Sequence, residues 1–145
     1  MDIEHIRQEA IDSEHLRLLA LFHYISGGLT ILFSSFFLLH LTFMSFMMRN
    51  FDKFAPANAP PPDIDPEQFM GVFIAVFGVM IAMGILYGMA QIVSGRFIKQ
   101  RRHRVFTIIV ALPNVVFIPY GTILAIFTLM VLDRNSVKQM YSSQA

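Results

Sequence analysis

Charged residues in this chain are confined to segments that separate three long uncharged windows. These windows cover residues 18–48, 68–95 and 105–132, and they contain 31, 28 and 28 residues. A helix rises about 1.5 Å per residue, so roughly 20 apolar residues cross the ~30 Å hydrocarbon core of a membrane. The first two windows are each long enough for a tilted crossing with interfacial ends. The pattern therefore predicts an all-α integral membrane protein with one domain, residues 1–145.

The first window predicts a helix over residues 14–48. Asp12 and Ser13 precede it, and both are favourable N-cap residues because their side-chain oxygens accept hydrogen bonds from free backbone N–H groups. Residues 1–13 are then expected to form a separate amphipathic segment at the N-terminus.

The second window predicts a helix over residues 67–95. Asp65-Pro66-Glu67 is typical of a helix start, since aspartate caps, proline suits the first helical position and glutamate complements the helix dipole. Five prolines between Pro56 and Pro66 favour extended structure over helix. They predict a proline-rich loop over residues 49–66 between the two helices.

The third window, residues 105–132, contains the stretch ALPNVVFIPYGTIL, which would interrupt a continuous helix. One kinked span would place the tail, residues 133–145, on the far side of the membrane. A turn at Pro119-Tyr120-Gly121 would instead return the tail, and a Pro-x-Gly sequence suits a turn. Each arm of such a hairpin has about 14 residues, or roughly 21 Å of helix, which is shorter than the bilayer. Both topologies remain open, and we favour the short-armed hairpin, which gives a bundle of four membrane segments.

Basic residues predict the orientation. The connecting segment, residues 96–104, holds five of the eleven: Arg96, Lys99, Arg101, Arg102 and Arg104. The proline-rich loop holds two basic residues and three acidic ones, and Glu67 directly follows it. The positive-inside rule therefore predicts a cytoplasmic basic segment, an external proline-rich loop and, with a hairpin, both termini in the cytoplasm. The same five basic residues are expected to attract anionic lipid headgroups.

Three stretches carry a resemblance: HLRLLALFHYISGGLTILFSSFFLLHL, RFIKQRRHR and PYGTILAIFTLMVLDRNSVKQMY. They are similar to a family of small uncharacterised bacterial membrane proteins, with a HYxxGGL-type first helix, a Gly-rich second helix and a P-x-G-T hairpin before a short tail. The resemblance covers roughly residues 16–141. It implies four segments in a bacterial inner (plasma) membrane, and it transfers no catalytic residue.

Small residues line two faces of the second helix. The first face consists of Gly71, Ala75, Gly78 and Ala82. The second face is rotated by roughly 140° and consists of Gly84, Gly88, Gln91 and Gly95. Small residues let helix backbones approach closely in lipid. The two faces predict a neighbouring helix on each side, either within the chain or in an oligomer or larger complex, with Phe77 facing lipid.

Polar residues inside the windows are candidate sites, because ionisable or strongly polar groups are costly in a membrane. On the first helix, one face is expected to point into the bundle, and it consists of His23, Gly27, Thr30 and Ser34. His40 lies on a different face, about 25 Å along the axis. Gln91 and Asn114 are expected to bond each other or the backbone freed by prolines.

Composition narrows the class of function. The chain has no cysteine, and all ten Asp and Glu residues lie outside the three windows. We find no nucleophile–base pair, metal cluster or cofactor motif, and so expect no enzyme and no nucleic-acid partner. The leading hypothesis is a non-catalytic accessory or scaffolding subunit that packs against itself or another membrane protein. The alternative is a small transporter or channel subunit, and the third is a haem- or metal-binding subunit that uses His23 or His40.

Overall fold

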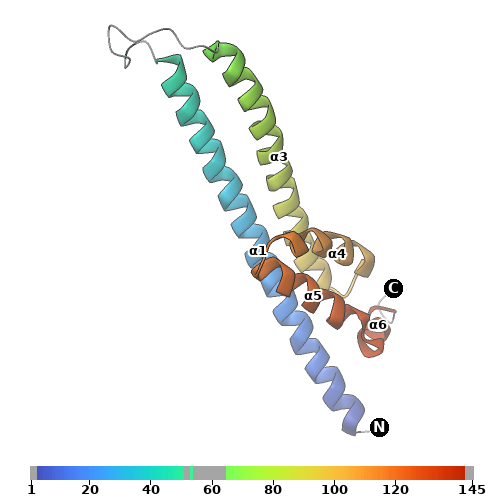
Figure 1. The fold of residues 1–145 in the computed structure, drawn as a ribbon. Helices are drawn as coiled ribbons and strands as arrows, with labels where there is room; N and C mark the ends of the chain where they lie inside the picture. Colours follow the sequence, from blue (N-terminus) through green and yellow to red (C-terminus); the bar gives the residue numbers. More distant parts are fainter. Residues whose placement is uncertain (1–2, 51–52, 54–64, 143–145) are drawn as a thin grey trace. The chain divides into compact units, whose positions relative to one another are not determined.

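The computed structural model describes residues 3–50, 53 and 65–142, which fold almost entirely into helices with no strand among them. Figure 1 shows the elements in chain order: α1 (Ile3–Arg49), α3 (Pro66–Lys99), α4 (Arg104–Ala111), the 3-10 helix η1 (Leu112–Val116), α5 (Tyr120–Asp133) and α6 (Asn135–Ser142). The all-α prediction is confirmed, and α1 and α3 are long and apolar enough to cross a membrane. Most of the predicted proline-rich loop, at residues 54–64, lies outside the described residues.

The helices belong to two compact units. The first consists of Met1–Leu29 and Tyr87–Ala145, and the second of Thr30–Leu86. The first unit therefore contains the start of α1, the end of α3 and all of the C-terminal helices. It holds most of the buried side chains described below.

Helix α1 begins at Ile3, so the predicted start at residue 14 is wrong. Asp12 and Ser13 lie inside the helix and cap nothing. The Ser13 hydroxyl donates to the carbonyl of Ala10 in the preceding turn, at 2.8 Å. Asp12 bonds to side chains of the C-terminal segment instead, and these tertiary contacts replace the local capping role. Helix α3 begins at Pro66, next to the predicted start, but continues four residues past the predicted end to Lys99.

The third window folds back on itself, in agreement with the predicted hairpin. Helix α4 and η1 form one arm, α5 forms the other, and the two arms pack together. The chain reverses at residues 117–119, slightly before the predicted position. The two ends of the window meet at Arg104, whose Nε donates to the carbonyl of Leu132 at 2.8 Å. Arg104 also pairs with Asp133, at 3.3 Å, and closes the base of the hairpin.

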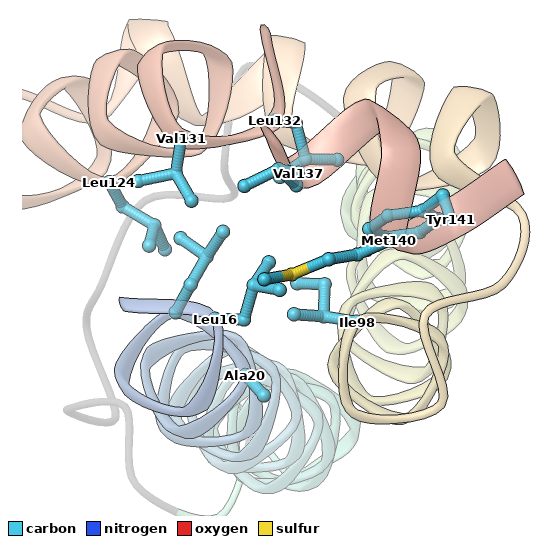
Figure 2. Close-up of a cluster of buried hydrophobic side chains, with 10 residues drawn as sticks. Leu16, Ala20, Ile98, Leu124, Val131, Leu132, Val137, Met140 and Tyr141 are labelled. Carbon is cyan, nitrogen blue, oxygen red and sulfur yellow. The ribbon is translucent and has the colours of Figure 1, made fainter. Parts of the chain in front are cut away.

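A cluster of buried apolar side chains joins four helices of the first unit (Figure 2). Its members are Leu16, Leu19, Ala20, Ile98, Leu124, Val131, Leu132, Val137, Met140 and Tyr141. Helix α6 provides three of them, although we predicted only a tail over residues 133–145. Its buried residues recur at the i, i+3, i+4 spacing of a helical face, so the sequence did contain the signal.

Close approach of α1 to α3 in the first unit depends on glycine. A Cβ added to Gly27 would lie 2.6 Å from the carbonyl oxygen of Gly88 and 2.7 Å from Cγ1 of Ile92. About two turns beyond Gly88 on α3, a Cβ added to Gly95 would lie 3.0 Å from the carbonyl oxygen of Ala20. The next residue of α1, Gly28, has no such atom within 4 Å of an added Cβ. The two adjacent glycines of α1 therefore differ in what surrounds them.

Replacing Gly27 with alanine is expected to lower the free energy of unfolding by about 1–3 kcal/mol, because the added methyl group overlaps α3. Gly28→Ala is the matched control, and it should be neutral or stabilising by roughly 0.5–1 kcal/mol, the usual gain from removing a helical glycine. Thermal unfolding in detergent, followed by circular dichroism, measures both. Equal shifts in the two variants would mean that the helices do not meet closely at Gly27.

Candidate functional site

The clearest polar site inside the apolar windows links α3 to the hairpin. The Nε2 amide of Gln91 donates to Oδ1 of Asn114 at 3.0 Å, which confirms that these two residues bond each other. The hydroxyl of Tyr87 lies 3.0 Å from the same Oδ1 and 2.9 Å from the carbonyl oxygen of Val110. Gln91 is 1% and Asn114 2% exposed, so these bonds lie away from any solvent or lipid. Tyr87 was not among the polar residues predicted from the sequence to form this site.

This site lies where the backbone cannot complete its own hydrogen bonds. Pro113 has no N–H to donate to the preceding turn, and the Tyr87 hydroxyl supplies a donor to Val110. On the other side of the reversal, the Thr122 hydroxyl donates to the carbonyl of Val115 at 2.8 Å. Gly121 packs so closely on the Asn114 carbonyl that a Cβ there would overlap it. Hydroxyl groups of α3 and α5 thus bond carbonyl groups near the reversal, and the one from Tyr87 comes from outside the hairpin.

Further polar side chains are buried in the first unit. Four that are fully buried inside or next to the apolar core are His23 of α1, Ser94 of α3, Thr107 of α4 and Thr128 of α5. The Nδ1 of His23 lies 3.0 Å from the carbonyl oxygen of Leu19, so this nitrogen carries the proton. Its Nε2 atom has no hydrogen-bond partner among the described residues, and neither do the hydroxyls of Ser94 and Thr107.

The predicted polar face of α1 is largely confirmed. His23, Gly27 and Ser34 are buried and Thr30 is half-buried, whereas His40 is exposed. Over the described part of the chain, no three His, Cys, Asp or Glu side chains come close enough to hold a metal ion. The geometry around His23 is that of a histidine packed between helices.

The two small-residue faces of α3 have different surroundings. The face with Gly84, Gly88 and Gly95 packs within the chain: a Cβ on Gly84 would overlap the Ser34 hydroxyl, and the other two lie against α1. The face with Gly71, Ala75, Gly78 and Ala82 faces outward. Apart from the local backbone of α3, no heavy atom of the described residues lies within 4 Å of a Cβ added to Gly71 or Gly78. Gly71, Ala75 and Ala82 are exposed, and Gly78 is half-buried. The expected neighbour is therefore present on one face and absent within the described chain on the other.

Phe77 was expected to face lipid, and the structure contradicts this. Its ring is half-buried, with its centroid 4.2 Å from that of Phe73, and it lines a cavity of about 200 Å³ together with Ser34 and Phe37. A period of 3.6 residues places Phe77 on the side of α3 opposite Ala75. A large apolar ring suits lipid and an apolar interior equally well, so the residue type alone does not distinguish the two environments.

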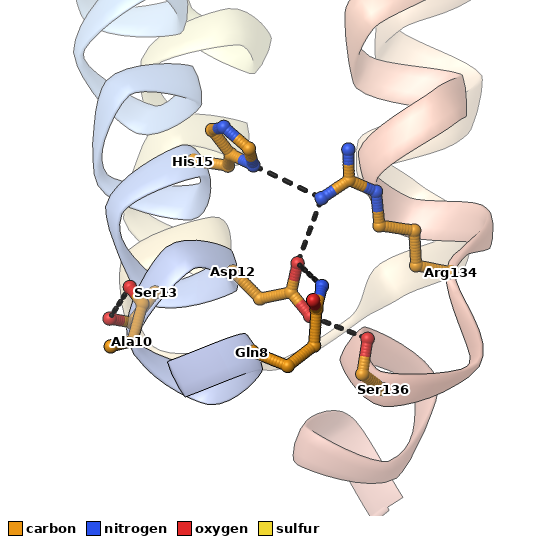
Figure 3. Close-up of polar contacts among 7 residues, drawn as sticks. All are labelled: Gln8, Ala10, Asp12, Ser13, His15, Arg134 and Ser136. Atoms are coloured by element: carbon orange, nitrogen blue, oxygen red, sulfur yellow. Dashed lines mark hydrogen bonds and ion pairs between the residues drawn. The ribbon is translucent and has the colours of Figure 1, made fainter. Parts of the chain in front are cut away.

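A second polar site ties the start of α1 to the end of the chain (Figure 3). The carboxylate of Asp12 is 0% exposed. It accepts hydrogen bonds from Arg134 Nη1 at 2.8 Å, from Gln8 Nε2 at 3.2 Å and from the Ser136 hydroxyl. The same nitrogen of Arg134 lies 3.1 Å from Nδ1 of His15. Three side chains, from α1, the α5–α6 junction and α6, therefore bind one carboxylate, and His15 contacts the arginine among them.

Two opposing effects set the pKa of Asp12. Burial disfavours the charged carboxylate and raises its pKa. Hydrogen bonds from Ser136, Arg134 and Gln8, together with the charge of Arg134, outweigh burial and leave the pKa below its ordinary value. The folded protein therefore holds Asp12 ionised at neutral pH.

The five basic residues predicted to meet lipid headgroups fall into two groups. Arg104 is committed to the base of the hairpin through Leu132 and Asp133. Arg96, Lys99 and Arg102 are exposed and Arg101 is half-buried. Arg101 and His103 adopt left-handed backbone conformations, with φ of 52° and 51°, at the connection between α3 and α4.

No protein-family model matches the chain, and comparisons with curated proteins and with solved structures find no match. The resemblance to small bacterial membrane proteins therefore stays a prediction from sequence motifs. Any account of function must start from the contacts and exposed surfaces described above.

Replacing Asp12 with asparagine is expected to lower the free energy of unfolding at pH 7 by about 1–3 kcal/mol, through loss of charged hydrogen bonds. Because the folded pKa is lowered, the contribution of Asp12 is complete above its unfolded pKa of about 3.9 and is lost as the pH falls through the folded pKa. As the pH falls from about 5 to about 2, the free energy of unfolding of wild-type protein should therefore decrease more steeply than that of Asp12→Asn. Thermal unfolding across this range measures the difference.

Glu14→Gln is the control for this experiment. Glu14 is an exposed carboxylate on the same helix, and its removal should leave both the stability and its pH dependence nearly unchanged. If Asp12→Asn and Glu14→Gln behave alike, the contact between α1 and the α5–α6 junction does not stabilise the fold.

Proposed function

We propose that the chain is a multi-pass protein of a bacterial inner membrane, in which α1 and α3 cross the bilayer and the hairpin of α4 and α5 enters it from one side. The support is an outward-facing apolar surface. Only 11% of the residues in the most apolar window of either long helix are buried. Large side chains such as Phe33, Leu39 and Met80 are more than 60% exposed. A soluble protein rarely leaves so much contiguous apolar surface open to water.

The proposed orientation places the basic residues 96–104 in the cytoplasm. Two features support this: the excess of basic residues there, and the resemblance to bacterial membrane proteins. Because Arg104 contacts Leu132 and Asp133, the hairpin starts and ends at the same side. Both termini are then cytoplasmic and the proline-rich loop is external.

Within this membrane we propose a non-catalytic accessory or scaffolding role. One observation carries the proposal, namely the outward face of Gly71, Ala75, Gly78 and Ala82. A face of small residues in lipid gives little packing to the acyl chains around it, but it lets a second helix approach to backbone contact. The matching face on the same helix is occupied by α1, as Gly84, Gly88 and Gly95 demonstrate. The open face is suited to a helix of a second copy or of another membrane protein.

A small transporter or channel subunit is the second candidate. It is favoured by the buried polar side chains at membrane depth, namely His23, Gln91, Ser94, Thr107, Asn114 and Thr128. Several of their polar atoms have no partner among the described residues, which is unusual for tightly packed helices. Against this role, no carboxylate lies inside the apolar windows, so a proton pathway there would have to use the imidazole of His23 or His40. Haem or metal binding ranks third. The Nε2 atom of His23 has no hydrogen-bond partner among the described residues, but it is buried and so not open to a ligand.

The accessory role predicts that Gly78→Leu weakens association without unfolding the protomer. The new side chain would occupy the position of a partner backbone, a change that typically costs about 1–3 kcal/mol, or roughly ten-fold in affinity. Val76→Leu is the matched control, since Val76 is 53% exposed on a different side of α3. Native gels of gently solubilised membranes should show a complex for wild type and Val76→Leu, and free protomer for Gly78→Leu. A wild-type protein that runs alone at 16.5 kDa would contradict the proposal.

A further inference from the structure

A groove of about 630 Å³ lies between the first part of α1 and the end of α3, within the first unit. One wall comes from α1 residues between Ser13 and Tyr24, and the other from Ile98, Lys99 and Arg101. The volume falls in the range of roughly 300–1,000 Å³ that is usual for small-molecule sites. None of the polar sites described above lines this groove.

Charge in the groove is mainly positive. Arg17, Lys99 and Arg101 line it together with one carboxylate, Glu14. In the described chain these three cationic side chains form no ion pair, whereas Arg104, Arg134 and Lys138 are paired with Asp133 or Asp12. Three cations against one carboxylate leave an excess of positive charge that no residue of the groove neutralises. The groove is therefore complementary to an anion.

Polarity changes along the length of the groove. On α1, Ser13, Glu14 and Arg17 lie before the uncharged window that begins at residue 18. Leu18 and Leu21 lie inside that window, 44% and 52% exposed, and they continue the same wall. The cations thus gather at the end nearest the cytoplasmic surface, and apolar side chains extend from there into the bilayer. Arginine side chains at such a depth can lay their methylene groups on apolar surface while the charge stays at the headgroups.

We propose that this groove binds one anionic phospholipid of the cytoplasmic leaflet. Its phosphate lies at Arg17, Lys99 and Arg101, and one acyl chain runs along Leu18 and Leu21. A zwitterionic lipid fits less well, because its own cation would meet the same three basic residues. The inference rests on the proposed membrane placement, and it assigns Arg17, which lies outside the basic segment 96–104, to lipid binding.

The test measures which phospholipid the protein retains. Wild-type protein is incorporated into nanodiscs of equal phosphatidylglycerol and phosphatidylcholine, re-extracted in mild detergent and examined by native mass spectrometry. Wild type should retain phosphatidylglycerol in about ten-fold excess or more, and the double variant Arg17→Gln/Lys99→Gln should lose most of this preference. The matched control is Arg7→Gln/Arg49→Gln. It removes the same charge from exposed positions of α1 that lie outside both the groove and the basic segment 96–104, and it should keep the preference.

Three results would overturn the proposal: no preference in wild type, equal loss in both double variants, or no loss in the groove variant. Extraction of the same membranes with alkaline carbonate tests the membrane placement separately. Protein that resists extraction but shows no lipid preference removes the lipid site alone. Protein released by carbonate overturns the membrane placement and the lipid site together.

Discussion

The hydrogen bond between Gln91 and Asn114 holds the hairpin at the point where its backbone is hardest to satisfy. In an apolar environment every unpaired N–H or C=O costs several kcal/mol, so a reversal can exist there only if other parts of the protein complete its hydrogen bonds. The side chain of Asn114 binds α3, its carbonyl accepts from the N–H of Phe117 at 3.0 Å, and Gly121 packs against that carbonyl. Asn114 therefore stabilises the reversal through its own carbonyl and attaches it to α3 through its side chain.

The base of the hairpin is fixed by charge, in contrast to its tip. Arg104 joins the two ends of the window through Leu132 and Asp133. The hydrogen bond and charge of Lys138, with a smaller effect of Arg104, hold the pKa of Asp133 below its ordinary value. Directly after the hairpin, Arg134 and Ser136 donate hydrogen bonds to the carboxylate of Asp12 on α1. Charged groups are inexpensive at a membrane surface and costly inside it. This distribution accounts for a hairpin with amides and hydroxyls at the tip and ion pairs at the base.

Local pattern was sufficient to predict the two long helices, the fold-back and the pairing of Gln91 with Asn114, but not the start of α1 or the existence of α6. Strongly polar residues are so few in these windows that Gln91 had few other partners, and proline with glycine marks a reversal whatever surrounds it. Prediction failed where contacts distant in sequence decide the outcome. Asp12 has the chemistry of an N-cap, but it bonds a residue 122 positions away, and the helix continues through it.

Faces of helices were harder to assign than their bounds. Both glycine faces of α3 could be read from spacing, but only the structure distinguishes the occupied face from the open one. Phe77 was expected to face lipid, but its ring packs beside Phe73, because an aromatic ring fills an apolar interior as well as it faces lipid. The groove between α1 and α3 could not be predicted, because it combines Arg17 of α1 with residues some 80 positions further along the chain, a pairing set by the approach of α1 to α3.

The claim that the third window turns back inside the membrane can be tested directly by topology reporters. Green fluorescent protein and alkaline phosphatase are fused in turn after Gln100, before the window, and after Ala145, beyond it. A hairpin predicts that both positions report on the same side: fluorescent, and without phosphatase activity. A single crossing predicts opposite sides, and active phosphatase at one position with fluorescence at the other would contradict the account.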